Sequence, residues 1–183
     1  MKVSFLSGEL GATFVARILP LAKFLEKYGI NCKIISPVNW GSLCKGKLKN
    51  ILSIILTHKI EEYVNIISSR PSVVIIGRTS TPQMFLLQKL LKMRGIKIIF
   101  DLNDALFLPI SNFLFANIRP GSFCLEKIIK SADWTTVNGH YLLGYVKLFN
   151  KKATIIHDPI DTRLFSPTLK KTHDKITIGW EGV

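Results

Sequence analysis

Two carboxylates follow one predicted strand. Asp101 and Asp104 lie three residues apart in the stretch DLND, directly after the β-like run Ile96–Phe100. Carboxylates at this spacing could orient a sugar hydroxyl or share a proton. Asp and Asn side chains also cap and brace loops, with no further role. The residues leave both interpretations open.

An arginine follows another predicted strand. Arg78 comes shortly after Ser72–Ile76, within the stretch GRTS. A guanidinium at the end of a strand could form a fork onto a phosphate or a carboxylate. The structural alternative is an ion pair between Arg78 and Asp101 or Asp104.

The turn Gly8–Thr13 follows the predicted strand Lys2–Leu6 and contains Gly11 and Ala12. Its amides could meet a phosphate or a sugar at the start of a helix, although a tight strand-to-helix turn needs no ligand. Dinucleotide binding is disfavoured because only two glycines occur here and no acidic residue ends the second strand, Asn31–Ser36.

Other catalytic motifs are missing from the sequence. It contains no G-x-x-x-x-G-K-[ST], no H-E-x-x-H and no G-x-S-x-G, and its histidines lack metal-ligand spacing. We therefore expect no metal site. Cys32, Cys44 and Cys124 show no C-x-x-C spacing, so we expect them to be small buried side chains in a reducing compartment.

Short β-like runs alternate with helical ones along the chain. This alternation, with Val- and Ile-rich strands, predicts an α/β, Rossmann-like three-layer domain with a mostly parallel sheet. The carboxyl ends of parallel strands meet at one edge, so the polar residues above should gather there. The remaining predicted elements are a helix from Phe14 to Leu25 that Tyr28-Gly29 stops, a helix over Thr81–Arg94 that Gly95 closes, helices over Phe123–Ser131 and Gly139–Phe149, and strands Ala132–Val137 and Lys152–His157.

Composition favours one packed domain with an anionic partner. The chain has 183 residues, of which 48% are hydrophobic and 20% charged, and 25 basic against 12 acidic residues give a net charge of +13. A nucleic-acid partner is one interpretation, but we expect no specific binding because no stacking platform or known motif accompanies the charge. Without a visible signal peptide or spanning stretch, we expect a cytoplasmic location.

The segment from Gly41 to Ser69 differs from the rest. Lys45, Lys47 and Lys49 precede aliphatic residues that recur at helical intervals. A basic amphipathic helix on an anionic membrane surface is one interpretation, and a buried helix covering the sheet is the other. Peripheral contact with the inner membrane face is therefore one of the expectations.

Four stretches follow one another along the chain: KVSFLSGELGATFVARILPLAKFLEKYGINCKIIS, VVIIGRTSTPQMFLLQKLLKMRGIKIIFDLNDALF, ADWTTVNGHYLLGYVKLFNKKATIIHDPIDTRLFSP and ITIGWEGV. Through these stretches, in this order, the chain resembles the N-terminal domain of a GT-B-fold glycosyltransferase of the "glycosyl transferases group 1" family. Asn103 departs from the middle acid of the family's D-x-D-D, and Asp158-Pro159 departs from its Asn-Gly linker.

The resemblance implies that residues 1–165 form an acceptor-binding domain, and 166–183 a linker and first strand of a C-terminal donor domain. Such an enzyme transfers a hexose from a nucleotide-sugar donor to a carbohydrate or lipid-linked acceptor, without a metal or a further cofactor. Gly11 and Ala12 would then lie near the donor phosphates and the acceptor, and Arg78 and Asp104 at the acceptor-side cleft. We expect this chain alone not to turn over. The alternative is a non-catalytic sugar- or phosphate-binding module.

Overall fold

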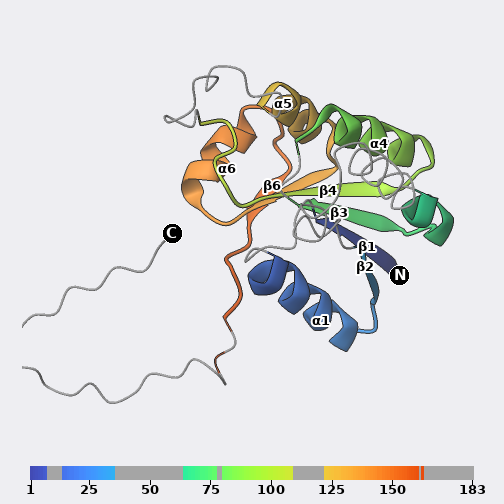
Figure 1. Cartoon of the computed structure of the whole chain (residues 1–183). Coiled ribbons are helices and arrows are strands. Elements are labelled where there is room, and N and C mark those ends of the chain that lie inside the picture. Colours follow the sequence, from blue (N-terminus) through green and yellow to red (C-terminus); the bar gives the residue numbers. More distant parts are fainter. Residues whose placement is uncertain (8–13, 36–63, 78–79, 109–121, 161, 163–183) are drawn as a thin grey trace, which may run out of the picture.

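The computed structural model describes residues 1–7, 14–35, 64–77, 80–108, 122–160 and 162 (Figure 1). Within these ranges six strands form a single sheet in which every neighbouring pair is parallel. The strands, in the spatial order β2-β1-β3-β4-β5-β6, are β1 (Lys2–Ser7), β2 (Asn31–Ile35), β3 (Val73–Gly77), β4 (Lys97–Leu102), β5 (Trp134–Val137) and β6 (Ala153–Ile155).

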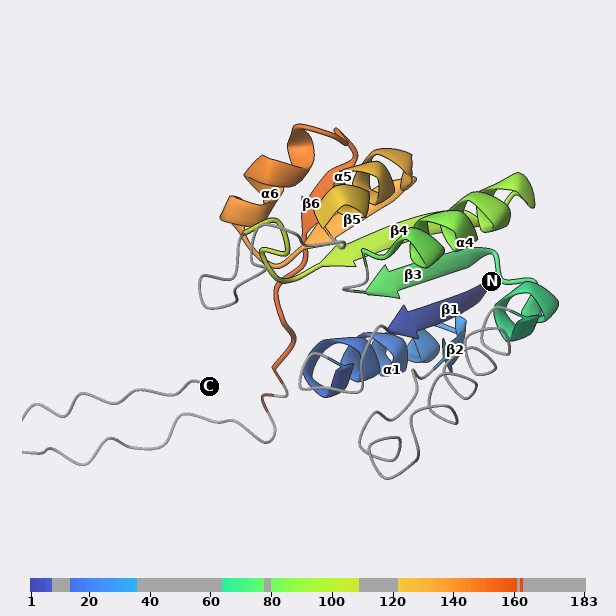
Figure 2. The same ribbon diagram turned by 45° about the horizontal axis from the view of Figure 1, so that its top comes forward.

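Helices cover both faces of this sheet, which confirms the predicted Rossmann-like three-layer arrangement. In Figure 2, α1 lies on one side of the strands and α4, α5 and α6 lie on the other. The described helices are the π-helical turn η1 (Phe14–Ile18), α1 (Leu19–Lys27), a helix over residues 64–69, α4 (Pro82–Met93), α5 (Ser122–Ser131) and α6 (His140–Lys147).

Each face of the sheet has its own hydrophobic core, because side chains alternate along a strand. In β4, Ile98 and Phe100 face the larger core under α4, α5 and α6, whereas Ile99 packs against the smaller core under α1. Phe5 and Ile75 belong to this smaller core. Such two-sided burial explains why the strands are rich in Val and Ile rather than alternating with polar residues.

The ends of the helices follow from their terminal residues. Thr81 caps α4, since its hydroxyl oxygen accepts a hydrogen bond from the backbone N–H of Met84 at 3.3 Å. Gly95 follows α4 with φ 76° and Gly29 follows α1 with φ 74°, a backbone region that glycine adopts at little cost. These residues confirm the predicted helix ends at the glycines.

Strand β4 extends further than the sequence predicted. The expected strand ended at Phe100, with Asp101 in the following loop, but β4 continues to Leu102. Asp101 is therefore a ladder residue, paired in register with Gly77 and Thr136. The neighbouring strands β3 and β5 pair with the backbone at Asp101. This strand pairing overrides the preference of an Asp-Leu-Asn-Asp stretch for a turn.

Much of the unusual segment 41–69 lies outside the described residues, as do Cys44, the basic residues Lys45, Lys47 and Lys49, and the predicted tail from 166 to 183. In the described part of the segment, Ile66 is buried in the larger core and Val64 is exposed. Cys124 is buried, as predicted, and Cys32 is half-buried. Among the helices in the described ranges, none has the length and apolar character to cross a bilayer.

Asp133 forms a hydrogen bond and ion pairs at the amino edge of the sheet. Its carboxylate accepts a hydrogen bond from the backbone N–H of Ile98 at 2.9 Å and lies 3.6 Å from Lys92 and 3.7 Å from Lys97. Burial alone would raise the pKa of Asp133, but the hydrogen bond from Ile98 and the two lysine charges outweigh it, so the pKa falls below its ordinary value of 3.8.

The lowered pKa gives a pH prediction. A carboxyl with a lower pKa in the folded than in the unfolded state stabilises the fold above the unfolded pKa, and this contribution is lost as pH falls through the folded pKa. We expect Asp133→Asn to lower the free energy of unfolding by about 0.5–1 kcal/mol at pH 7. In urea titrations the difference from wild type should shrink toward pH 3; a constant difference, or an equal loss in the exposed Glu26→Gln, would contradict this.

Candidate functional site

A row of residues crosses the sheet close to the carboxyl ends of its strands. The register pairs Ser7 with Gly77, Gly77 with Asp101, Asp101 with Thr136, and Thr136 with Thr154. The arrowheads of β1, β3 and β4 point the same way in Figure 2. In open parallel sheets ligands bind outside this edge, where the order of the strands reverses. Here the reversal falls between β1 and β3.

A buried arginine lies at this edge and binds an aspartate on the central strand. Arg17 Nε donates to Asp101 Oδ2 and Arg17 Nη2 donates to Asp101 Oδ1, both at 2.8 Å. This is the bidentate geometry that a guanidinium fork forms with a carboxylate. Thr136 Oγ1, on β5, donates a third hydrogen bond to Asp101 Oδ1.

The same guanidinium also holds the chain where it leaves the sheet. Arg17 Nη1 donates to the carbonyl oxygen of Ile156 at 2.8 Å and to Asp158 Oδ1 at 2.7 Å. Ile156 directly follows β6, so one side chain connects η1, β4 and the segment after β6. We call Arg17, Asp101, Thr136, Asp158 and the Ile156 carbonyl the arginine clamp.

Local sequence explains the unusual helix that carries Arg17. Pro20 has no N–H to donate to the carbonyl four residues earlier, and its ring crowds that carbonyl. The helix is π-helical over Phe14–Ile18 and becomes α-helical from Leu19, with the proline in its first turn. A π-turn shifts the phase of the helix, and such turns are frequent at functional sites.

Electrostatics keep the clamp charged. Burial lowers the pKa of Arg17, but the hydrogen bonds and charges of Asp101 and Asp158 outweigh this effect and raise it. The guanidinium is 3% exposed, Asp101 is nearly as buried, and Asp158 is half-exposed at 51%. Two carboxylates share one cation, so with both ionised the clamp carries a net negative charge within a strongly basic chain.

The clamp changes what Asp101 can do. Both of its oxygens accept hydrogen bonds from Arg17 and Thr136, so substrate would have to compete with a buried ion pair for them. The geometry therefore does not favour the expectation that Asp101 and Asp104 act as an equivalent pair.

An aromatic stack supports the loop that carries Asp104. The ring of Phe107 lies parallel to that of Tyr145 on α6, with centroids 3.8 Å apart and planes 14° apart, and Tyr141 lies 5.9 Å from Phe107. Tyr145 also contacts Phe149 edge to face at 5.2 Å. Stacking of this kind adds to the area that the rings bury. The stack thus fixes residues 103–108 against α6, with Asp104 half-buried at the carboxyl edge.

The other predicted site residues are Gly11, Ala12 and Arg78, and all three lie outside the described residues. Their place in the sequence is consistent with the same edge, since positions 8–13 follow β1 and positions 78–79 follow β3. Arg17 is the described partner of Asp101, and the ion pair considered for Arg78 lies outside the described residues. Roles for Gly11, Ala12 and Arg78 stay predictions.

Arg17 itself was missed as a site residue, although the sequence holds a signal for it. The helix from Phe14 to Leu25 shows an apolar stripe, and Arg17 falls on it, three residues after Phe14 and four before Leu21. A lone charge on a buried helix face requires an opposite charge.

Among the described residues, no group of three or more His, Cys, Asp or Glu side chains could hold a metal ion.

Comparison with known proteins adds no relative: no protein-family model matches the chain, and no curated protein is significantly similar to it.

Proposed function

We propose that this chain is the acceptor-binding half of a two-domain glycosyltransferase that uses a nucleotide-sugar donor. The observation that carries the proposal is the polar carboxyl edge of the all-parallel sheet, beside the point where the strand order reverses. The resemblance of four ordered stretches to the group 1 glycosyltransferases supports the same conclusion.

In this proposal each site residue has a separate role. Asp104, fixed by the aromatic stack, accepts a hydrogen bond from an acceptor hydroxyl and orients its oxygen toward the anomeric carbon. The new C–O bond forms as the bond to the donor's diphosphate breaks, and the hydroxyl proton leaves with the phosphate product or a base. Gly11, Ala12 and Arg78 would contact the phosphates or the acceptor. The arginine clamp keeps the end of β4 in place without touching substrate.

A matched pair of variants tests the role of Asp104. We expect Asp104→Asn to reduce transfer about 10- to 100-fold, because the substrate hydroxyl would then donate its hydrogen bond to a neutral amide rather than to a carboxylate. Glu26→Gln, an exposed carboxylate change on α1, should leave transfer unchanged. The assay is hydrolysis and transfer with a panel of nucleotide sugars, using this chain and any longer product of the same reading frame.

Each outcome of that assay has a meaning. Activity that requires the longer product and falls in Asp104→Asn supports the proposal. Full activity in Asp104→Asn would remove Asp104 from the site, and a lack of transfer by either product with every donor would contradict a transferase.

The alternative is a binding module without catalysis, and the clamp favours it in one respect. Because Asp101 is bound by Arg17, its carboxylate is engaged in an ion pair and is less suited to act as a base. Such a module needs no base, only hydrogen bonds to a sugar or a phosphate. Binding of sugar or sugar phosphate with no turnover in either product would establish the module.

A further inference from the structure

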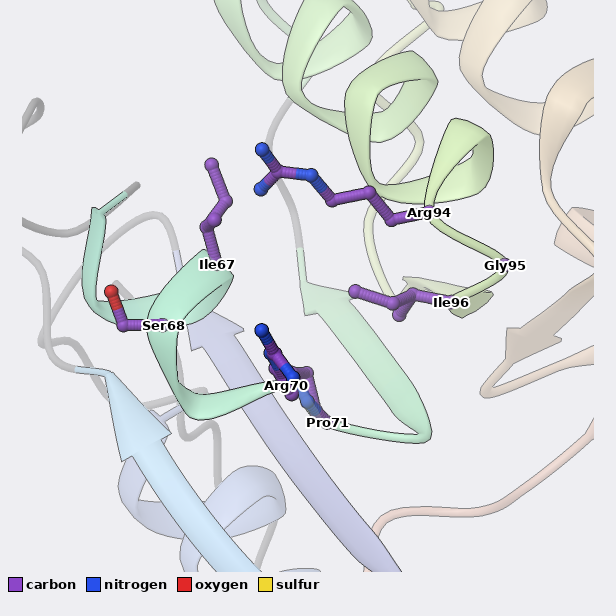
Figure 3. A pocket seen from close by; sticks show the side chains of 7 residues that line it. All are labelled: Ile67, Ser68, Arg70, Pro71, Arg94, Gly95 and Ile96. Carbon is purple, nitrogen blue, oxygen red and sulfur yellow. The ribbon is translucent and has the colours of Figure 1, made fainter.

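A pocket lies at the amino edge of the sheet, opposite the candidate functional site. It has a volume of about 720 Å³ and is lined by residues of the 64–69 helix, by those before β3 and by those between α4 and β4 (Figure 3). This is within the size range of pockets that hold small organic ligands. Nothing in the proposed transfer reaction uses this edge, so the pocket has to be explained separately.

Two arginines line the pocket from different elements. In Figure 3, Arg94 extends from the end of α4 toward Ile67, and Arg70 lies between the 64–69 helix and the start of β3. Among the residues that the structure describes, we find no hydrogen-bond or ion-pair partner for either guanidinium. No lining residue carries a carboxylate. Two cations without a counter-charge attract an anion, and the net charge of +13 strengthens that attraction.

The backbone of Arg70 is a second observation. Its φ is 42°, and no other non-glycine residue in the described ranges has a positive φ. Glycine or asparagine would adopt this conformation at lower cost. A large charged residue held there is the kind of local strain that is found at ligand sites.

The remaining walls of the pocket are apolar. Pro71 and Ile96 are buried and Ile67 is half-buried, while the Ser68 side chain adds a hydroxyl. Inorganic phosphate alone would leave most of 720 Å³ empty. Walls of this composition fit a ligand with an apolar or ring-shaped body. Each guanidinium fork can bind one phosphate group, so two arginines in one pocket favour a ligand with more than one.

We propose that the pocket between Arg70 and Arg94 binds a soluble organic phosphate, preferably one with a diphosphate group. The site is distinct from the edge where we place sugar transfer, and it stands whether or not the chain is a transferase. Bound ligand would bridge the 64–69 helix to the end of α4.

The test uses pyrophosphate and ADP as probes, titrated against the ¹⁵N-labelled chain. We expect the amide signals of Ser68, Gly95 and Ile96 to shift, with ADP binding more tightly than pyrophosphate. Arg94→Gln and Arg70→Asn should each weaken binding about tenfold, since each removes one charged fork. Asparagine suits the positive φ, so Arg70→Asn removes the guanidinium without straining the backbone. The double variant should lose binding.

Control variants distinguish a specific binding site from non-specific electrostatic attraction. Lys23→Gln removes an exposed positive charge on α1, on the other face of the sheet, and should leave both affinities within twofold. Arg94→Lys keeps the charge but loses the fork, so its affinity should lie between wild type and Arg94→Gln. Thermal melts of every variant verify that the fold is intact.

Three results would overturn the proposal. One is unchanged binding in the double variant, and another is an equal loss in Lys23→Gln, which would indicate non-specific attraction. The third is binding to vesicles containing phosphatidylserine but to neither soluble probe, which would make the pocket part of a membrane contact instead.

Discussion

Replacing Arg17 with methionine is expected to lower the free energy of unfolding by about 3–5 kcal/mol, because it breaks a buried ion pair. The variant leaves Asp101 buried with no cation, and the Ile156 carbonyl loses its side-chain donor. A fork of two 2.8 Å hydrogen bonds disappears with the charge. Urea denaturation followed by circular dichroism measures the loss.

Three further variants show where the loss arises. Arg17→Lys keeps the charge and loses the fork, so we expect an intermediate effect. Arg17→Met combined with Asp101→Leu removes both buried charges and should cost clearly less than the sum of the two single changes. The exposed Lys23→Met should stay within about 0.5 kcal/mol of wild type. A loss of under 1 kcal/mol in Arg17→Met would show that the clamp contributes little.

Phe100→Ala is expected to be comparably destabilising, by about 3–5 kcal/mol. Phe100 is fully buried on β4, between β3 and β5, and belongs to the larger core. Truncation removes the contacts of a whole ring and leaves a cavity that the surrounding sheet can fill only in part. The change is measured as the shift of the urea midpoint at constant slope.

Two further variants serve as controls for Phe100→Ala: a smaller reduction in volume at the same position, and the loss of an exposed aromatic ring. Phe100→Leu keeps most of the volume, so its loss should be smaller, at about 1–2 kcal/mol. Tyr28→Ala removes an aromatic ring that is 70% exposed and should cost under about 1 kcal/mol. Equal losses in Phe100→Ala and Tyr28→Ala would contradict the assignment of Phe100 to the core.

The fold was predictable where local signals agreed with tertiary packing. The Val- and Ile-rich runs became strands, and Gly29 and Gly95 ended the helices before β2 and β4 as expected. The prediction was wrong at the end of β4, because strand pairing with β3 and β5 decides where a ladder stops, and those partners are remote in sequence. The π-turn was not predicted, since periodicity alone does not distinguish it from an α-helix.

The position of the candidate site could be predicted from the sequence, but the residues that bind one another within it could not. Because parallel strands share one carboxyl edge, the position of Asp101 at that edge followed from the strand pattern. Its binding to Arg17 did not, as the two residues are 84 positions apart and a sequence pattern does not reveal which buried charges meet. Arg78, next to a strand end, was the nearer candidate. The lone charge in the apolar stripe around Arg17 shows that a partner exists without identifying it.

The arginine clamp also has a consequence for the kinetics of folding. It joins residues separated by 84 and by 141 positions, so it closes only after the central strands and β6 have taken their register. Contacts of such long range form late, because the entropy of closing the chain has to be overcome first. Interactions absent from the folding transition state act on the unfolding rate. We therefore expect the clamp to slow the opening of the native sheet while leaving its rate of formation almost unchanged.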